Sequence, residues 1–483
     1  MTQGSVSCSV RIRTFFWHLL DKRLVSVLLL MPLPLWALSP LDSYIQEAMA
    51  NNPNLAQAQF EVQAEQERLA NLRARFYPSL SLQARASVSE GGRTIDFPAG
   101  DLLNPVYATL NAQAVAAGQP ARFPTVQNQS IPLLRPTEQD TRLILRGPIY
   151  EPALDSQVQA QNNAVNAQLA AQQQIKEELA RDLKTAYWQY AQAQSRIQVL
   201  QGSLQTLQEN ERVNQTLYKA GETTLDVPRR AQAETLEVKV GLQQAQTQAL
   251  LAREYFNLLR HAPEQSEVNL PSEQFDTDTL SQVLDSLRPT DNATSPPPAL
   301  TRLEMNLAAQ RAQLQASQAS FKPTLGYSIE GGYQGRDYST GPDTGFATAS
   351  VVLNWTLADA GIRNSEVARA QAQVNALQAK AAQVTRQLSL AKLQAKENLL
   401  VSLSSIEARV AQRDAAEESL RITVRKRDAG ETTPVEFLSA EQSATRARMG
   451  LISAVYQARI DHAIWQYNNR NIAQPSPLEG ATQ

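Results

Sequence analysis

Two kinds of hydrophobic periodicity alternate along this chain. In the stretches 153–218 and 364–428, apolar residues recur every three or four positions among Ala, Gln, Leu, Glu and Arg, with no Pro and almost no Gly. The seam positions are Ile197, Leu200, Leu204 and Leu207 in the first stretch, and Val374, Leu377, Ala381, Val384 and Leu388 in the second. Because this spacing is typical of coiled coils, it predicts two helices, each roughly 100 Å long.

Shorter helical segments flank each long one. They are predicted at 53–75, 224–261, 297–320 and 433–468, and several of them have proline near the first turn. The two short segments of each half add up to nearly the length of its long helix. We therefore expect two short helices to stack end to end beside one long helix, in a two-column coiled coil.

A period of two replaces the helical period in four segments. Leu80, Leu82, Ala84, Ala86 and Val88 alternate with Ser79, Ser81, Gln83, Arg85 and Ser87. The same alternation occurs at 324–330 and 347–356, and more weakly at 141–150. We expect four strands with one apolar and one polar face. The segment between the first two strands is rich in Gly, Pro and Asn, which predicts a long external loop.

The chain contains an internal duplication. The sequence Ala-Gly-Glu-Thr-Thr occurs at 220–224 and again at 429–433, and the flanking helical segments align at the same offset. We interpret 38–262 as a first structural repeat, 263–296 as a linker, 297–470 as a second repeat, and 471–483 as a disordered tail. In each repeat, the Gly is expected to end the long helix in a left-handed conformation, and the Thr residues to cap the next helix.

The first 37 residues have the pattern of a secretory signal peptide. Basic residues precede an apolar run at 24–30, and a small residue, Ala37, follows. A membrane anchor is the alternative, but the apolar run is short, and two prolines interrupt its continuation over 31–37. Cleavage after Ala37 would remove Cys8, which is the single cysteine, and would leave 41 basic and 46 acidic residues.

Composition and motifs exclude several classes of function. The formal net charge of −2 gives no electrostatic basis for binding nucleic acid. The chain has no phosphate-binding Gly loop, no Gly-x-Ser-x-Gly elbow and no His-Glu-x-x-His. A di-metal carboxylate bundle needs Glu-x-x-His, but Leu258 and Arg459 precede His261 and His462 by three positions. We therefore predict no enzyme activity, no catalytic residues, no metal and no cofactor.

Four amphipathic strands predict an oligomer. If they span a bilayer, their two unpaired edges have to be closed, and the smallest closed barrels have about eight strands. Three chains supply twelve strands, and their coiled-coil columns would close into a cylinder at the same time. A soluble amphipathic sheet, or a soluble periplasmic coiled-coil spacer, is the alternative. The spacer would leave the strands and their open edges unexplained, whereas the signal peptide and the very long helices argue against a soluble sheet.

The order of these elements resembles the TolC-like outer-membrane efflux protein family over residues 39–470. The marks are the opening Leu41-Asp-Ser-Tyr, the Phe76-Tyr-Pro78 strand start, Asn354-Trp-Thr-Leu-Ala-Asp-Ala-Gly361, and Gly430-Glu-Thr-Thr-Pro434. The resemblance implies an α+β membrane protein: a homotrimeric, 12-stranded outer-membrane barrel in contact with lipid, continuous with a helical tunnel through the periplasm of a Gram-negative bacterium.

The resemblance also implies partners and a function. Such channels are exit ducts of tripartite efflux pumps, which join a periplasmic adaptor (membrane fusion) protein and an inner-membrane transporter, and they pass small molecules such as drugs or metals. A type I protein secretion channel is the alternative within the family. The adaptor would dock on the tips of the tunnel. These tips correspond to Ala220, Gly221, Glu222, Thr223, Thr224, Ala429, Gly430, Glu431, Thr432 and Thr433.

By the same resemblance, Asp226 and Glu436 are the candidates for a closed pore constriction just beyond the tips. Ser439 stands where some members have a second acidic residue. Six carboxylates brought toward one axis would repel one another and favour bound cations or raised pKa values. The alternative role for both residues is capping of the first turn of a helix.

Overall fold

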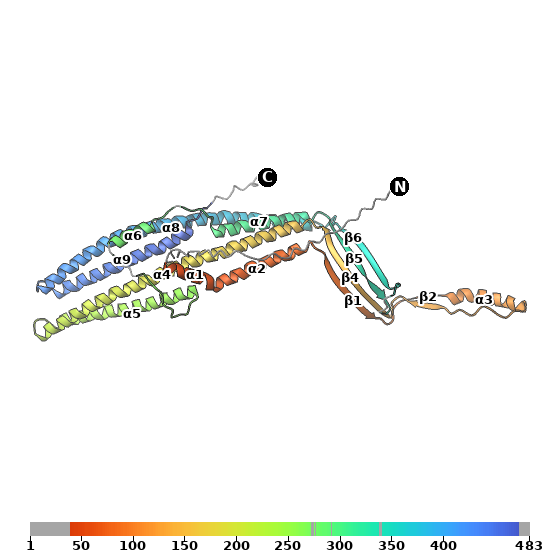
Figure 1. The fold of residues 1–483 in the computed structure, drawn as a ribbon, viewed down its shortest axis with the longest axis horizontal. Coiled ribbons are helices and arrows are strands. Elements are labelled where there is room, and N and C mark those ends of the chain that lie inside the picture. The colour runs from red at the N-terminus through yellow and green to blue at the C-terminus, as the bar shows by residue number, and fades with distance from the viewer. Residues whose placement is uncertain (1–38, 272–274, 276, 291, 338–340, 473–483) are drawn as a thin grey trace, which may run out of the picture.

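The computed structural model describes residues 39–271, 275, 277–290, 292–337 and 341–472. The predicted signal peptide lies outside the described residues, and so does the predicted tail from residue 473 onward. The described chain is elongated, with a helical bundle at one end, a curved sheet beyond it, and a slender arm at the far end of the sheet (Figure 1).

Two helices run the length of the bundle. They are α4 (Leu154–Lys219) and α8 (Ile362–Asp428), with 66 and 67 residues, and they match the predicted long helices to within two residues. Four predicted seam residues are buried: Leu200, Leu207, Val374 and Ala381. The other predicted seam residues are half-buried. Ala, Gln and Leu favour the helix along its whole length, and the apolar seam orients it toward its neighbours.

The four shorter predicted helices are confirmed. They are α2 (Pro53–Ala74), α5 (Asp226–Arg260), α7 (Pro298–Ala319) and α9 (Pro434–Asn468). Helices α2 and α5 pack along α4, and α7 and α9 pack along α8, as the two-column arrangement requires (Figure 1). Helices α7 and α9 also pack against α4, which joins the two repeats into one bundle.

Two short helices add to the predicted set. Helix α1 (Pro40–Asn51) begins at Ser39, whose hydroxyl accepts a hydrogen bond from the Asp42 amide, and helix α6 (Thr277–Leu287) lies within the predicted linker. Both cover the middle of the bundle. An aromatic cluster of Tyr44, Tyr187, Trp188 and Phe256 joins α1, α4 and α5 there. Leu280 and Leu287 of α6 pack on the α8–α9 pair.

The four predicted strands form one antiparallel sheet in the order β1-β4-β5-β6. They are β1 (Ser79–Val88), β4 (Thr137–Tyr150), β5 (Thr324–Gly335) and β6 (Gly345–Asn354). Strand β4 begins four residues before its predicted start. The strands have 10 to 14 residues, which is enough for a tilted strand to cross a bilayer. Within the chain, β1 and β6 each pair on one side only, so both edges of the sheet are open.

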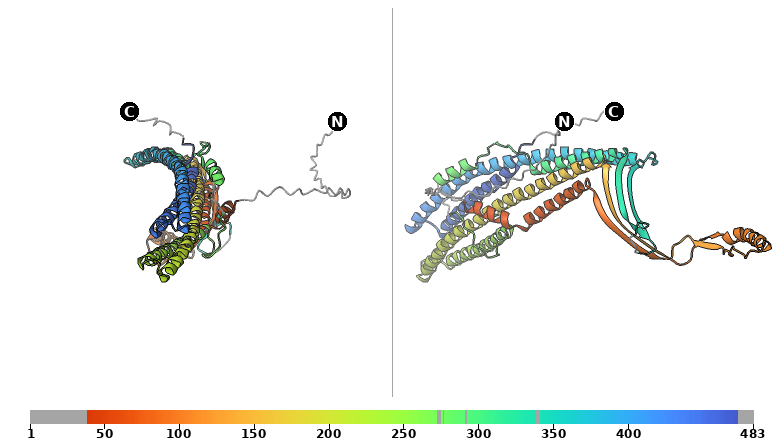
Figure 2. Two further views of the ribbon diagram at one scale, coloured as in Figure 1. Left: turned by 90° about the vertical axis from the view of Figure 1, so that its left-hand side faces the viewer. Right: turned by 45° about the vertical axis from the view of Figure 1, so that its right-hand side comes forward.

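The predicted external loop between β1 and β4 has a structure of its own. Strands β2 (Thr94–Phe97) and β3 (Gln129–Pro132) form a small ladder, and helix α3 (Ala99–Ala116) lies beyond it. Figure 2 shows this arm extending away from the end of the sheet. The amide side chains of Asn104 and Asn111, one heptad apart on α3, bind the backbone of the returning segment at Val126 and at 122–123.

Candidate functional site

One face of the four-stranded sheet is apolar and uncovered. Leu80 and Leu82 are 67% and 68% exposed, and Val351 is 67% exposed. Further exposed apolar side chains on this face are Val88, Leu143, Ile329 and Leu353. The pairing of Leu80 with Leu145 and of Ile329 with Ala349 places these residues on the same side of the sheet, as their alternation predicted. A broad exposed apolar surface on one side of a sheet marks contact with lipid or with another protein.

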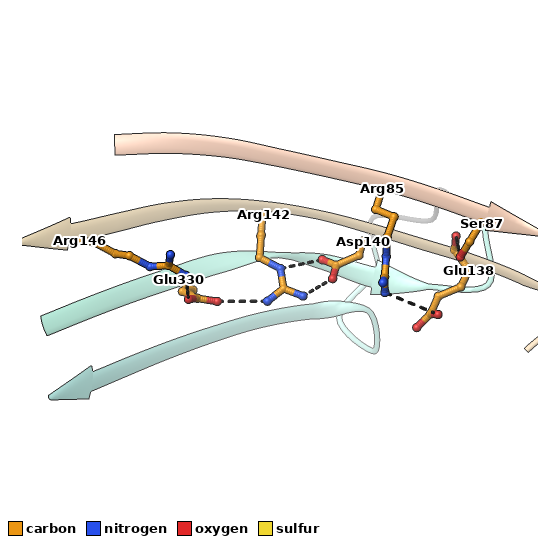
Figure 3. A network of polar contacts seen from close by, with 7 residues as sticks. All are labelled: Arg85, Ser87, Glu138, Asp140, Arg142, Arg146 and Glu330. Atoms are coloured by element: carbon orange, nitrogen blue, oxygen red, sulfur yellow. Dashed lines mark hydrogen bonds and ion pairs between the residues drawn. The ribbon is translucent and has the colours of Figure 1, made fainter. Parts of the chain in front are cut away.

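The opposite face is polar and carries a network of charges (Figure 3). Arg142 of β4 donates hydrogen bonds to Asp140 on its own strand and to Glu330 of β5, at 2.9 and 3.1 Å. Arg146 donates to Glu330 at 3.2 Å, and Arg85 of β1 lies 3.8 Å from Glu138. The polar alternation predicted Arg85 and Glu330 on this face. It did not bring out the network, because Arg142 and Glu330 are 188 residues apart in the sequence.

The two predicted tip turns have the same backbone geometry. Gly221 and Gly430 have φ of +78° and +76°, in the left-handed region. After each glycine, the next amide returns to a carbonyl five residues back: Glu222 to Leu217 at 2.9 Å, and Glu431 to Lys426 at 2.8 Å. This is the Schellman pattern, which satisfies the last carbonyls of α4 and α8. Both turns lie at the end of the bundle farthest from the sheet (Figure 1).

The helices that leave the tips start differently. Helix α9 starts with a capping box: the Thr433 hydroxyl accepts from the Glu436 amide at 3.3 Å, and the Glu436 carboxylate accepts from the Thr433 amide at 3.1 Å. In the first repeat, the Thr224 hydroxyl donates to the Asp226 carboxylate at the start of α5. The alternative role predicted for these acids, capping of a first helical turn, is therefore present for Glu436. Asp226 lies in the first turn of α5, but no side chain of the described residues caps that helix.

Glu436 is stabilised as an anion. Its pKa is lowered, chiefly by the hydrogen bond from the Thr432 hydroxyl and next by the Thr433 amide. This direction is opposite to the raised pKa expected from six carboxylates around one axis, because a single chain contains the lowering hydrogen bonds without the carboxylates of two further chains. No contact described here tests whether Asp226 and Glu436 line a pore, so that role stays a prediction.

The remaining chemistry of the described residues is sparse. In the described part of the chain, no three His, Cys, Asp or Glu side chains gather where they could hold a metal ion. His261 ends α5 in a left-handed conformation. His462 is half-buried on α9, and its pKa is lowered by burial and by the nearby charge of Lys184.

Among the described helices, none combines the length and the apolarity needed to cross a membrane.

Known proteins resemble both the sequence and the fold. Residues 291–463 match the family model described as outer membrane efflux protein. The fold is similar to that of the outer-membrane channel OprN, with a TM-score of 0.70 and 18% identity over 90% of this chain and 91% of that chain. The outer membrane protein VceC from Vibrio cholerae has a TM-score of 0.69 and 17% identity over 90% of this chain and 97% of its own.

A third similar structure is the open state of the MtrE outer membrane channel from Neisseria gonorrhoeae. It has a TM-score of 0.68 and 18% identity over 89% of this chain and 88% of that chain. No curated protein sequence matches the chain. The sequence match falls on the second repeat, whereas the similarity of fold extends over both repeats.

Proposed function

Because residues 291–463 match the outer membrane efflux protein model and the fold is similar to that of outer-membrane channels, we propose that the chain forms the outer-membrane exit duct of a tripartite efflux pump. Three copies would join their sheets into a 12-stranded barrel in the outer membrane, and their helical bundles into a tunnel through the periplasm. Small molecules would pass from an inner-membrane transporter, through a periplasmic adaptor and this duct, to the exterior.

One observation carries this proposal: the sheet has two open edges and an uncovered apolar face. A bilayer does not tolerate unpaired backbone groups, so a four-stranded sheet can enter it only by pairing its edges with other copies. The apolar face then suits lipid and the charged face suits an aqueous lumen. A soluble spacer protein would expose the same apolar face to water at a large free-energy cost.

The tips suit a docking role. Both turns present the same Ala-Gly-Glu-Thr-Thr sequence in the same Schellman geometry, so a trimer would present six similar tips at its periplasmic end. We propose that these turns contact the adaptor. We further propose that Asp226 and Glu436, one to two helical turns past the tips, contribute to the constriction of the closed tunnel.

Fractionation and sizing test the proposal. Cells expressing the full chain are separated into soluble periplasm, inner membrane and outer membrane, and the detergent-extracted protein is chemically cross-linked and sized. We expect a trimer in the outer membrane, and hypersensitivity to toxic small molecules when the chain is deleted. A monomer in the soluble periplasmic fraction would contradict the proposal.

A further inference from the structure

All the charged residues of the four strands lie on one face of the sheet. They are Arg85, Glu138, Asp140, Arg142, Arg146 and Glu330. Three are basic and three are acidic, so this wall of the sheet has no net formal charge at neutral pH. The balance is local, because each arginine lies within hydrogen-bond or ion-pair distance of at least one of the three carboxylates (Figure 3).

Glu330 holds the central place in this network. Its two carboxylate oxygens accept from different arginines, Oε1 from Arg146 at 3.2 Å and Oε2 from Arg142 at 3.1 Å. The Ser328 hydroxyl also donates to Oε1, at 3.1 Å. Arg142 has a second carboxylate partner in Asp140, whereas Arg146 has no other carboxylate partner within the described residues. Loss of the Glu330 charge would therefore leave Arg146 uncompensated.

The backbone fixes Arg142 in this network. Its register neighbours on the same face are Gly332 on β5 and, one strand further, Phe346 on β6. The guanidinium carbon of Arg142 lies 5.4 Å from the Phe346 ring centroid. A Cβ at position 332 would come within 2.1 Å of the Thr141 carbonyl oxygen and 2.9 Å of the Arg142 Cβ, so only glycine allows this approach. The positions of the charges are thus built into the sheet.

A hollow on the polar face extends from the charge network to the end of α2. It is lined by Glu330 and Arg146 together with Ser328 and Ser350, and by Arg75 next to α2. Without Glu330, the side chains of this hollow would present cations with no carboxylate among them. In a narrow lumen, uncompensated charge of one sign raises the local concentration of the opposite ion.

We propose that Glu330 is a selectivity-determining residue of the barrel lumen: it keeps the wall electrically balanced and so prevents the duct from concentrating anions. The inference rests on the proposed function, because the charged face becomes a lumen only when three sheets close. In the trimer, neutralising Glu330 would expose three Arg146 side chains around one axis.

A cysteine reporter tests the charge balance beside Glu330 directly. It avoids a conductance measurement, which the proposed periplasmic constriction would also affect. In a Cys8→Ser background, Ser350→Cys places one thiol in the same hollow as Glu330. Purified detergent trimers are reacted at low salt with an anionic and a cationic methanethiosulfonate of similar size, and the ratio of the two rates is divided by the ratio for a free thiol. We expect Glu330→Gln to raise the anion-to-cation ratio about threefold or more, and Arg146→Gln to lower it.

The control is Glu304→Gln, which neutralises an exposed carboxylate on α7 and should leave the ratio unchanged. Unchanged ratios in both Glu330→Gln and Arg146→Gln, with the Ser350→Cys thiol reactive in a trimer, would overturn the inference and leave the proposed function standing. A second reporter, Val351→Cys, lies on the apolar face. If Val351→Cys reacts and Ser350→Cys does not, the assignment of the faces is wrong, and the proposed function fails with the inference.

Discussion

Glu436 shows how one side chain ends a turn and starts a helix. Its folded-state pKa lies below the unfolded value of about 4.3, so its stabilising effect is present above that pH and is lost as the pH falls through the folded pKa. We expect Glu436→Gln to speed amide exchange at 433–436 at pH 7. The variant and the parent should converge only once the pH has fallen below the lowered folded-state pKa, where the parent's carboxyl is protonated too.

Hydrogen-exchange mass spectrometry across this pH range makes the comparison. Glu431→Gln is the matched control, since it removes a charge from the same turn outside the capping box. A difference between Glu436→Gln and the parent that persists unchanged at low pH would mean that the charge of Glu436 does not stabilise the turn.

The tip turns need glycine for its left-handed backbone conformation and not because a side chain would clash with a neighbour. A Cβ on Gly430 would meet nothing within 4 Å, so Gly430→Val acts only through the left-handed φ, at roughly 1 to 2 kcal/mol. We expect adaptor pull-down to fail while the yield of trimer stays normal. The control is Gly241→Ala in α5, which is equally open but helical, and which should stabilise that helix by about 0.5 to 1 kcal/mol. Normal adaptor binding after substitution of both Gly221 and Gly430 would refute the docking role.

The proposed constriction gives a third prediction at this scale. Asp226→Ala combined with Glu436→Ala removes six carboxylates from the periplasmic end of a trimer. We expect divalent cations to block the single-channel current in planar bilayers less strongly, because fewer anionic ligands remain. If conductance and block match the parent, both residues act only as helix caps.

At the scale of elements, the arm is held together by amide side chains. Asn111 makes three hydrogen bonds to the backbone of 122–123, at 2.8, 3.0 and 3.0 Å. Asn111→Ala should cost about 1 to 3 kcal/mol and free the returning segment from α3. Trypsin should then cleave after Arg122 faster, while the trimer persists. Gln113→Ala, on an exposed position of the same helix, is the control, and equal cleavage rates in the two variants would contradict this account.

Features that depend on local interactions are predictable from the sequence, whereas those that depend on contacts between distant segments are not. The long helices, the strands and the tip turns depend on periodicity and local turn chemistry, and the sequence predicts them to within a few residues. The arm was expected to be a loop because its sequence is rich in Gly, Pro and Asn, and Pro105 lies within the helix that it forms. That helix is stabilised by the chain returning more than ten residues later. The Glu330 network was missed for a similar reason, since it depends on a register between strands that are far apart in the sequence.

In the whole molecule, the duplicated helical columns and the open sheet edges both leave a structure that further copies of the chain would complete. Each chain supplies four helical columns, two from each repeat, and half as many strands as the smallest closed barrel needs, so only the proposed trimer would complete the barrel and the tunnel. If the signal peptide is removed as predicted, the mature chain has no cysteine, which makes engineered disulfides easy to interpret.

Closure of the barrel across β1 and β6 of neighbouring copies is the central claim, and disulfide scanning tests it most directly. Ala84→Cys on β1 is combined in turn with Ala347→Cys, Ala349→Cys and Val351→Cys on β6, and outer membranes are run on non-reducing gels. Ala84→Cys with Thr141→Cys, which are register partners within one sheet, is the intrachain control. We predict that one β6 position gives a covalent trimer and nothing larger. Oxidised chains that remain monomers for every pair, while the control pair forms its disulfide, would contradict the account.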